Sequence, residues 1–307
     1  VTRTFLRDRA NQIVLGIFVA TFVYALLVLR EVRSVDDEAF VPAIAVWWAF
    51  VLLVASVGAF IYYIDHMAQA MRVETVIDHV GTETQDAIDR NFPDPAGSLP
   101  VIELPLPEPT VVVIAPDRPS TLQAIDQDTL ERIAGDAQVV LEVVPIIGDF
   151  VPSGAPLVRV RGDGAVDADD ARSAFALGSE RSMDQDPAFG LRQLVDIAVR
   201  ALSPGTNDPT TATMVIFRIH DLLGRLGRRA IPGPQRLGAD GAVRLVIPVR
   251  TWDDHVKLAT GEIIDYGGTS SQVVTALRTM LDDLEATVDE ERRPVIRRQR
   301  DRLPLGR

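Results

Sequence analysis

Two polar segments near the middle of the chain hold the side chains with the clearest potential for chemistry. Residues 177–187 read LGSERSMDQDP, and residues 200–212 read RALSPGTNDPTTA. Carboxylate and amide oxygens could hold a divalent cation, and guanidinium groups could hold a polar ligand. The six candidates are Arg181, Asp184, Asp186, Arg200, Asn207 and Asp208. Both segments adjoin one predicted helix, 189–202, so we expect a possible ligand site where they meet.

Common catalytic patterns are missing from these segments. There is no Ser–His–acid trio, phosphate-binding loop or dense cluster with metal-ligand spacing. The chain has no cysteine, which excludes disulfides, thiolate metal sites and a cysteine nucleophile. We therefore predict no catalytic residue, no metal site and no cofactor, and favour a protein that is not an enzyme.

A structural interpretation competes with the ligand site. Asp186 and Asp208 each precede a proline, the order of an N-cap followed by the first helical residue. We predict that Asn207 and Asp208 form the turn and cap of a helix at 209–226. We also expect the segment 181–187 to pack against 203–208, with Arg181 or Arg200 paired to Asp184, Asp186 or Asp208.

The elements around these segments form an α+β region. Apolar runs predict strands at 111–114, 139–144, 157–160 and 243–249. Helical periodicity predicts helices at 167–177, 189–202, 209–226, 253–264 and 270–288, followed by a charged tail. The run GDFVPSGAPL at 148–157 resembles the turn of barrel-sandwich modules such as lipoyl and biotinyl domains. It contains no lysine, so a swinging lipoyl or biotinyl arm is excluded.

Two long apolar segments precede that region. Residues 10–29 and 39–64 carry no charge, and each is long enough to span a bilayer as a helix. Arg3, Arg7 and Arg9 come before the first segment, so the positive-inside rule favours a cytoplasmic start, an outward hairpin and a cytoplasmic body. We expect a multi-pass protein of the bacterial inner membrane, with the lipid bilayer as a partner.

The segment 65–91 reads as an amphipathic stalk helix that leaves the membrane. Its apolar stripe includes Met71, Val76, Ile77, Val80 and Ala87. Six prolines follow in 92–110, which is typical of an extended linker. Because a flexible linker would not hold a domain against the stripe, we expect the stripe to pack against other copies of the chain in a homo-oligomer.

Charge is distributed unevenly along the 307 residues. The net charge is −12, and residues 1–64 contribute zero, so the entire excess lies in the polar remainder. Such a surface repels phosphate backbones, which argues against nucleic-acid binding. The arginine-rich tail after Glu290 is a local exception, and either solvent, anionic lipid or an acidic surface could face it.

The chain resembles a known family. The runs RTFLRDRANQIVLGIFVATFVYALLVL, GDFVPSGAPL and LGSERSMDQDPAFGLRQLVDIAVRALSPGTNDPTTA are similar to bacterial membrane proteins of the family called domain of unknown function 2254. Members usually carry two further membrane helices upstream, which implies that this chain lacks its natural amino terminus. The resemblance implies a fold and a membrane location but no activity.

These observations define one expected architecture. It consists of a transmembrane hairpin at 1–64, a stalk helix at 65–92, a linker at 93–110, a small barrel-sandwich-like β module at 111–162 and a mostly helical domain at 163–307. The favoured function is an oligomeric channel or transport-related protein with an acidic cytoplasmic domain. The alternative is a membrane-anchored ligand-sensing, scaffold or regulatory subunit, with a small ligand or cation as its partner.

Overall fold

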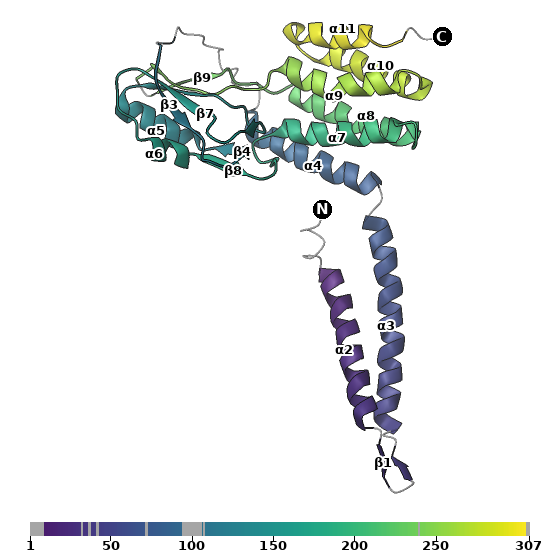
Figure 1. The fold of residues 1–307 in the computed structure, drawn as a ribbon. Coiled ribbons are helices and arrows are strands. Elements are labelled where there is room, and N and C mark those ends of the chain that lie inside the picture. The colour runs from purple at the N-terminus through teal and green to yellow at the C-terminus, as the bar shows by residue number, and fades with distance from the viewer. Residues whose placement is uncertain are drawn as a thin grey trace. The chain divides into compact units, whose positions relative to one another are not determined.

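The computed structural model describes residues 9–31, 33–35, 38–40, 43–70, 73–93, 106, 108–238 and 240–304. Within it the chain forms two compact units, Val1–Val76 and Ile77–Arg307 (Figure 1).

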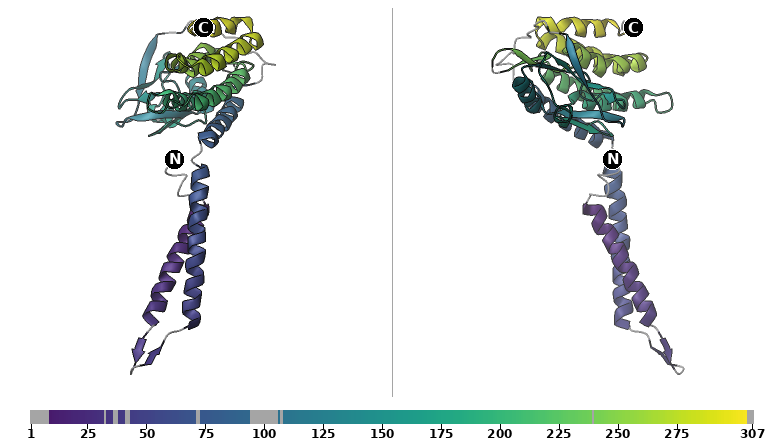
Figure 2. Two further views of the ribbon diagram at one scale, coloured as in Figure 1. Left: turned by 90° about the vertical axis from the view of Figure 1, so that its right-hand side faces the viewer. Right: turned by 60° about the vertical axis from the view of Figure 1, so that its left-hand side comes forward.

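The first unit is a pair of apolar helices. Helix α2 (Arg9–Glu31) and helix α3 (Ala43–Ala70) run side by side, joined by the antiparallel strands β1 (Arg33–Val35) and β2 (Glu38–Phe40) (Figure 2). The stretches Ile13–Arg30 and Ala43–Ile64 are long and apolar enough to cross a membrane. Most of their side chains are exposed in this unit, as expected of surfaces that face lipid. The predicted pair of apolar helices is confirmed.

The second unit contains a helical bundle at one end. Its helices pack around a shared apolar core (Figure 1). They are the last part of α4 (Val73–Asn91), α7 (Pro187–Leu202), α8 (Pro209–Leu226), α9 (Trp252–Gly267), α10 (Ser271–Thr287) and α11 (Arg293–Asp301), with a 3-10 turn at Glu290–Arg292. Capping hydrogen bonds help to fix where some of these helices begin. For example, Thr251 and Asp254 form a reciprocal capping box at α9.

Helix α4 belongs to this bundle, and this removes the reason for expecting its stripe to face other copies of the chain. Ile77, Val80 and Ile88 are buried in the bundle core. The fit is close: a Cβ on Gly190 of α7 would lie 1.8 Å from Thr84 Oγ1. The chain that follows the proline-rich segment returns to cover these core residues and Ala87, whereas Val76 of the predicted stripe is 41% exposed. Met71 and most of the predicted linker 93–110 lie outside the described residues.

The other end of the second unit is a β region with its own apolar core. One sheet has the order β3-β7-β5-β10-β9, and a second has the order β6-β4-β8. The strands are β3 (Pro109–Ile114), β4 (Ser120–Ile125), β5 (Val140–Val143), β6 (Phe150–Val151), β7 (Pro156–Arg161), β8 (Phe175–Gly178), β9 (Gln235–Leu237) and β10 (Val243–Val246). Helices α5 (Gln127–Ala137) and α6 (Ala168–Ser173) accompany them.

The topology is more interleaved than the expected sequential modules. Strand β10 pairs in parallel with β5, although the whole helical pair α7 and α8 lies between them in sequence. The strand expected at 243–249 therefore contributes to the sheet of the β region rather than standing alone in a helical domain. A β region is confirmed, but the barrel-sandwich arrangement is not, because the strands divide between sheets of five and three.

Four arginines of the arginine-rich tail pair with carboxylates of the same chain. Arg297 and Arg300 pair with Glu285 of α10, Arg298 pairs with Asp253 of α9, and Arg302 pairs with Asp265. These ion pairs fasten α11 to its neighbouring helices. Arg292 and Arg293 of the tail instead donate to main-chain carbonyl oxygens.

Candidate functional site

The segment before α7 is organised by a buried ion pair. Arg181 donates to Asp186 Oδ2 from Nε at 3.0 Å and from Nη2 at 2.5 Å, and its guanidinium lies 4.8 Å from the Phe189 ring centre. Asp186 is only 3% exposed. It occupies the N-cap position of α7, but its side chain makes no capping hydrogen bond. A buried carboxylate is stabilised here by its cation instead of by the helix.

The GDFVPSGAPL turn closes on that ion pair. Gly148 has φ +91°, and a Cβ at this position would lie 2.2 Å from Asp186 Oδ2. Only glycine fits both the conformation and the space. The neighbouring Asp149 accepts a hydrogen bond from the Ile146 N–H at 3.0 Å. Two separate sequence motifs therefore meet at the contact between Gly148 and Asp186.

The segment after α7 has a different role. Asp208 caps α8 by accepting from the Thr210 and Thr211 N–H groups at 3.1 and 3.0 Å. These hydrogen bonds, led by the Thr211 hydroxyl and N–H, hold the pKa of Asp208 below its ordinary value. Asn207 is exposed and adopts φ +47° in the turn. The predicted turn and cap are present.

The six candidate residues do not gather in one place. Helix α7 has 16 residues, which at 1.5 Å per residue separates its ends by about 24 Å. Arg181, Asp184 and Asp186 precede the helix, while Asn207 and Asp208 follow it. Arg200, in the last turn, is exposed, and Asp184 is exposed and accepts from the Ser182 hydroxyl. Of the expected contacts, only the Arg181–Asp186 pair forms.

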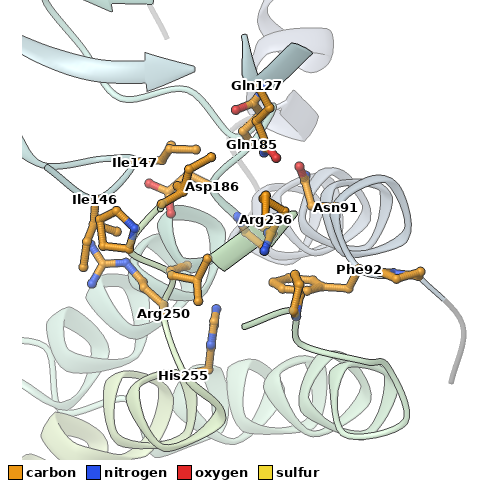
Figure 3. A pocket seen from close by; sticks show the side chains of 17 residues that line it. Asn91, Phe92, Gln127, Ile146, Ile147, Gln185, Asp186, Arg236, Arg250 and His255 are labelled. Carbon is orange, nitrogen blue, oxygen red and sulfur yellow. The ribbon is translucent and has the colours of Figure 1, made fainter. Parts of the chain in front are cut away.

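A pocket lies where the helical bundle meets the β region (Figure 3). Its volume is about 280 Å³, near the lower end of the range for small-molecule sites. Only Asp186 of the six candidates lines it. The other polar side chains around it are Asn91, Gln127, Gln185, Arg236, Arg250 and His255, and the apolar part of the wall includes Phe92, Ile146, Ile147 and Val249.

Three cationic or titratable groups dominate the electrostatics of this pocket. Burial lowers the pKa of the Arg236 guanidinium, with Glu131 giving a smaller opposite effect. Burial likewise lowers the pKa of His255, whose side chain is 2% exposed. His255 Nδ1 lies 2.8 Å from the Thr251 carbonyl oxygen, so Nδ1 carries the proton and Nε2 is left as the acceptor in the neutral ring. Arg250 reaches Asp149 at 3.5 Å.

Sequence reasoning missed Arg236, Arg250 and His255. Arg236 lies on strand β9, Arg250 in a loop and His255 on helix α9, and the fold brings these distant segments together. The only local signal was that Arg250 directly precedes the capping box of α9. Among the described residues, no group of three or more His, Asp or Glu side chains is placed to hold a metal ion.

Two apolar helices of membrane-spanning length and a folded helix-and-sheet unit with a small pocket are the features of a membrane protein with a large polar unit. The chain belongs to the family described as "Predicted membrane protein (DUF2254)", whose sequence profile matches residues 1–283. This confirms the resemblance seen in the sequence.

Three similar proteins come from mycobacteria. Uncharacterized proteins of Mycobacterium bovis and of two strains of Mycobacterium tuberculosis are each 33% identical to this chain over 308 aligned positions, covering 97% of it. The chain spans 59% of the length of these relatives. No solved structure matches the chain.

Proposed function

We propose that this chain is the membrane-anchored part of a ligand-sensing or regulatory protein, and that its ligand binds in the pocket between the helical bundle and the β region. The observation that carries the proposal is that both halves of the second unit, and the end of α4, supply the walls of this one pocket. A ligand that touches both halves favours the arrangement in which they are closed around it.

Helix α4 is the element that can relay occupancy along the chain. Asn91 and Phe92, at its end, line the pocket, and Asn91 Nδ2 donates to the Asp184 carbonyl at 2.9 Å. Helix α4 begins at Val73, and α3 ends at Ala70. A change at the pocket end of α4 can thus be transmitted through this one helix to the apolar helices that precede it in sequence, as a sensor requires.

Binding is preferred to catalysis because the reactive side chains already have structural partners. Asp186 is neutralised by Arg181, and His255 is held by the Thr251 carbonyl. No second carboxylate or hydroxyl completes a nucleophile–base pair with either group in the described part of the chain.

The channel hypothesis has less support than sensing. It rested on a stripe of α4 facing other copies around a central pathway, and the bundle of the same chain buries Ile77, Val80 and Ile88 of that stripe. Homo-oligomerisation through the membrane helices stays a prediction. The positive-inside rule, applied to Arg3, Arg7 and Arg9, supports a bacterial inner-membrane location with the second unit in the cytoplasm.

The test is ligand-dependent stabilisation of the full chain in mild detergent. Small anionic, cationic and neutral metabolites are added, and the thermal unfolding midpoint is measured. A ligand of the folded state raises that midpoint in proportion to the logarithm of its concentration. We expect at least one such compound, and slower hydrogen exchange at the end of α4 when it is bound.

Two bulky substitutions locate the binding site. Val249→Trp fills the pocket, whereas Val112→Trp adds the same bulk on β3, at an exposed position outside it. We expect the response to survive in V112W and to disappear in V249W. An undiminished response in V249W, or no response of the wild type to any compound, would contradict the proposed function.

A further inference from the structure

Two guanidinium groups of the pocket lack a close anionic partner. Arg236 donates to the Gly233 and Gln235 carbonyl oxygens. Among the described residues no carboxylate lies within ion-pair distance of it, and Glu131 has only a weaker electrostatic effect. Arg250 meets Asp149 only at 3.5 Å, and its buried Nε has no hydrogen-bond partner in the part of the chain that the structure describes. Buried donors are normally satisfied, so these groups favour a ligand that accepts hydrogen bonds.

Helix N-termini add to the positive potential at the same place. Helix α5 begins at Gln127 and α7 at Pro187, and both residues line the pocket. Arg250, in the pocket wall, directly precedes the N-cap of α9. No side chain caps α7, because Asp186 is engaged by Arg181. Asp126 caps α5, and Thr251 with Asp254 caps α9. The N-terminus of α7, which has no side-chain cap, is therefore the end whose positive partial charge can attract an anion.

The negative groups nearby are already committed. Asp186 is paired with Arg181 at 2.5 Å. Asp149 accepts from the Ile146 N–H at 3.0 Å and is shared with Arg250. The chain as a whole has a charge of −12, yet this pocket is lined by two guanidinium groups, Arg236 and Arg250, and by one carboxylate, Asp186, which is already paired with Arg181. That local reversal of sign indicates a binding site for negative charge.

From this arrangement we infer that the ligand of the pocket is a small anion, a phosphate or carboxylate group with few further atoms, held by Arg236 and Arg250. The inference rests on the proposed function and specifies its ligand class. The planar guanidinium groups match paired anionic oxygens. His255, Gln127 and Asn91 also line the pocket and supply further polar groups for such a ligand (Figure 3). A volume of about 280 Å³ is too small for a dinucleotide.

The experiment uses the full chain in neutral detergent at low salt. Binding of glycerol phosphate, inorganic phosphate and citrate is measured by titration calorimetry, with glycerol as the neutral match. We expect at least one anion to bind and glycerol not to bind. Arg236→Gln and Arg250→Gln should each lower the affinity for that anion at least tenfold. Arg278→Gln is the control, because Arg278 lies outside the pocket and donates to the Pro304 carbonyl oxygen. This substitution should leave the affinity for the anion unchanged.

Further variants keep the result interpretable. Arg236→Lys retains the charge without the paired donors, and we expect intermediate affinity with an unchanged unfolding midpoint. It therefore tests the inference even if a glutamine variant does not fold. Displacement of the bound anion by phosphatidic acid, but not by phosphatidylcholine, would support a lipid headgroup as its source. Absence of displacement would support a soluble anion.

Two results would overturn the inference. The first is equal binding of glycerol and glycerol phosphate, and the second is anion binding that neither arginine variant weakens. The proposed function fails separately: it requires only that some ligand, charged or neutral, loses its effect in Val249→Trp. A neutral ligand with that behaviour would support the proposed sensor function and contradict the inference that the ligand is an anion.

Discussion

The two ends of helix α7 present the same dipeptide in contrasting surroundings. Asp186-Pro187 begins α7, and Asp208-Pro209 begins the next helix, α8. Asp208 caps its helix with two hydrogen bonds to main-chain N–H groups, while Asp186 caps nothing and is buried against Arg181. The same sequence signal thus accompanies a local structural role at one end and a long-range role at the other.

The difference shows where the second unit holds its functional potential. A capping aspartate satisfies its own helix and needs no neighbour from elsewhere in the chain. Asp186, by contrast, joins Arg181, the Gly148 turn and the pocket wall in a single contact. The beginning of α7 is therefore the end that a ligand can influence, and the turn after α7 is expected to be independent of it.

Breaking the buried pair should have the largest effect. Asp186→Asn leaves the Arg181 guanidinium without its anion, and we expect a loss of about 3 kcal/mol in the free energy of unfolding. The thermal unfolding midpoint checks this, since 1 kcal/mol corresponds to about 2–4 °C for a unit of this size. Asp184→Asn is the matched control because Asp184 is exposed, and its effect should stay within about 0.5 kcal/mol. Equal effects of the two substitutions would show that the Arg181–Asp186 pair contributes no more to stability than an exposed carboxylate, and would contradict the long-range role of Asp186.

A second prediction concerns the turn that covers the pair. Gly148→Ala introduces a Cβ 2.2 Å from Asp186 Oδ2 at φ +91°, and we expect a loss of about 2 kcal/mol. Gly154→Ala is the control in the same turn. It has φ +67° but no atom within 4 Å of the new Cβ. A larger loss in G154A than in G148A would show that backbone conformation, rather than the ion pair, decides the requirement for glycine.

The sequence predicted most local elements correctly because their signals are local. Helix α8 starts where an aspartate, a proline and helix-forming residues occur in order, and it spans Pro209–Leu226 as expected. The strands near 111–114, 139–144 and 157–160 also lie where apolar runs place them. The region 167–177 was only half right, because α6 ends at Ser173 and β8 follows at Phe175–Gly178. Pairing of β8 with β4 outweighed its helical periodicity.

Long-range contacts were not accessible in the same way. The parallel pairing of β10 with β5 joins segments about a hundred residues apart, and the sequence of neither strand indicates which strand it will pair with. The pocket follows the same rule, since Arg236 and Arg250 approach Asp186 only after the chain has passed through α7 and α8. Burial of the α4 stripe likewise came from helices far along the sequence. Chemistry that depends on these meetings could not be assigned from residue types alone.

The cap of α8 gives the third prediction and its pH dependence. Asp208→Ala should lower the free energy of unfolding by about 1 kcal/mol, whereas Asp208→Asn keeps an accepting oxygen and should cost less. The folded-state pKa of Asp208 lies below its ordinary value of 3.8. Its contribution is therefore present above that value and is lost as the pH falls through the folded-state pKa. The difference between wild type and D208A should be constant near neutral pH and shrink below about pH 4, which unfolding midpoints measured in a pH series will show.

The smallest expected effect is at Asn207, and it tests the independence of the turn after α7. Asn207 is exposed at φ +47°, a conformation that glycine adopts freely, asparagine tolerates and alanine resists by about 1 kcal/mol. Asn207→Gly should therefore be neutral or slightly stabilising, and Asn207→Ala should be mildly destabilising. Neither substitution should change the affinity of the pocket ligand, because the turn lies about 24 Å from the other end of α7. A change in ligand affinity in N207G, with an unchanged unfolding midpoint, would mean that the two ends of α7 act together and that the turn has a role beyond starting a helix.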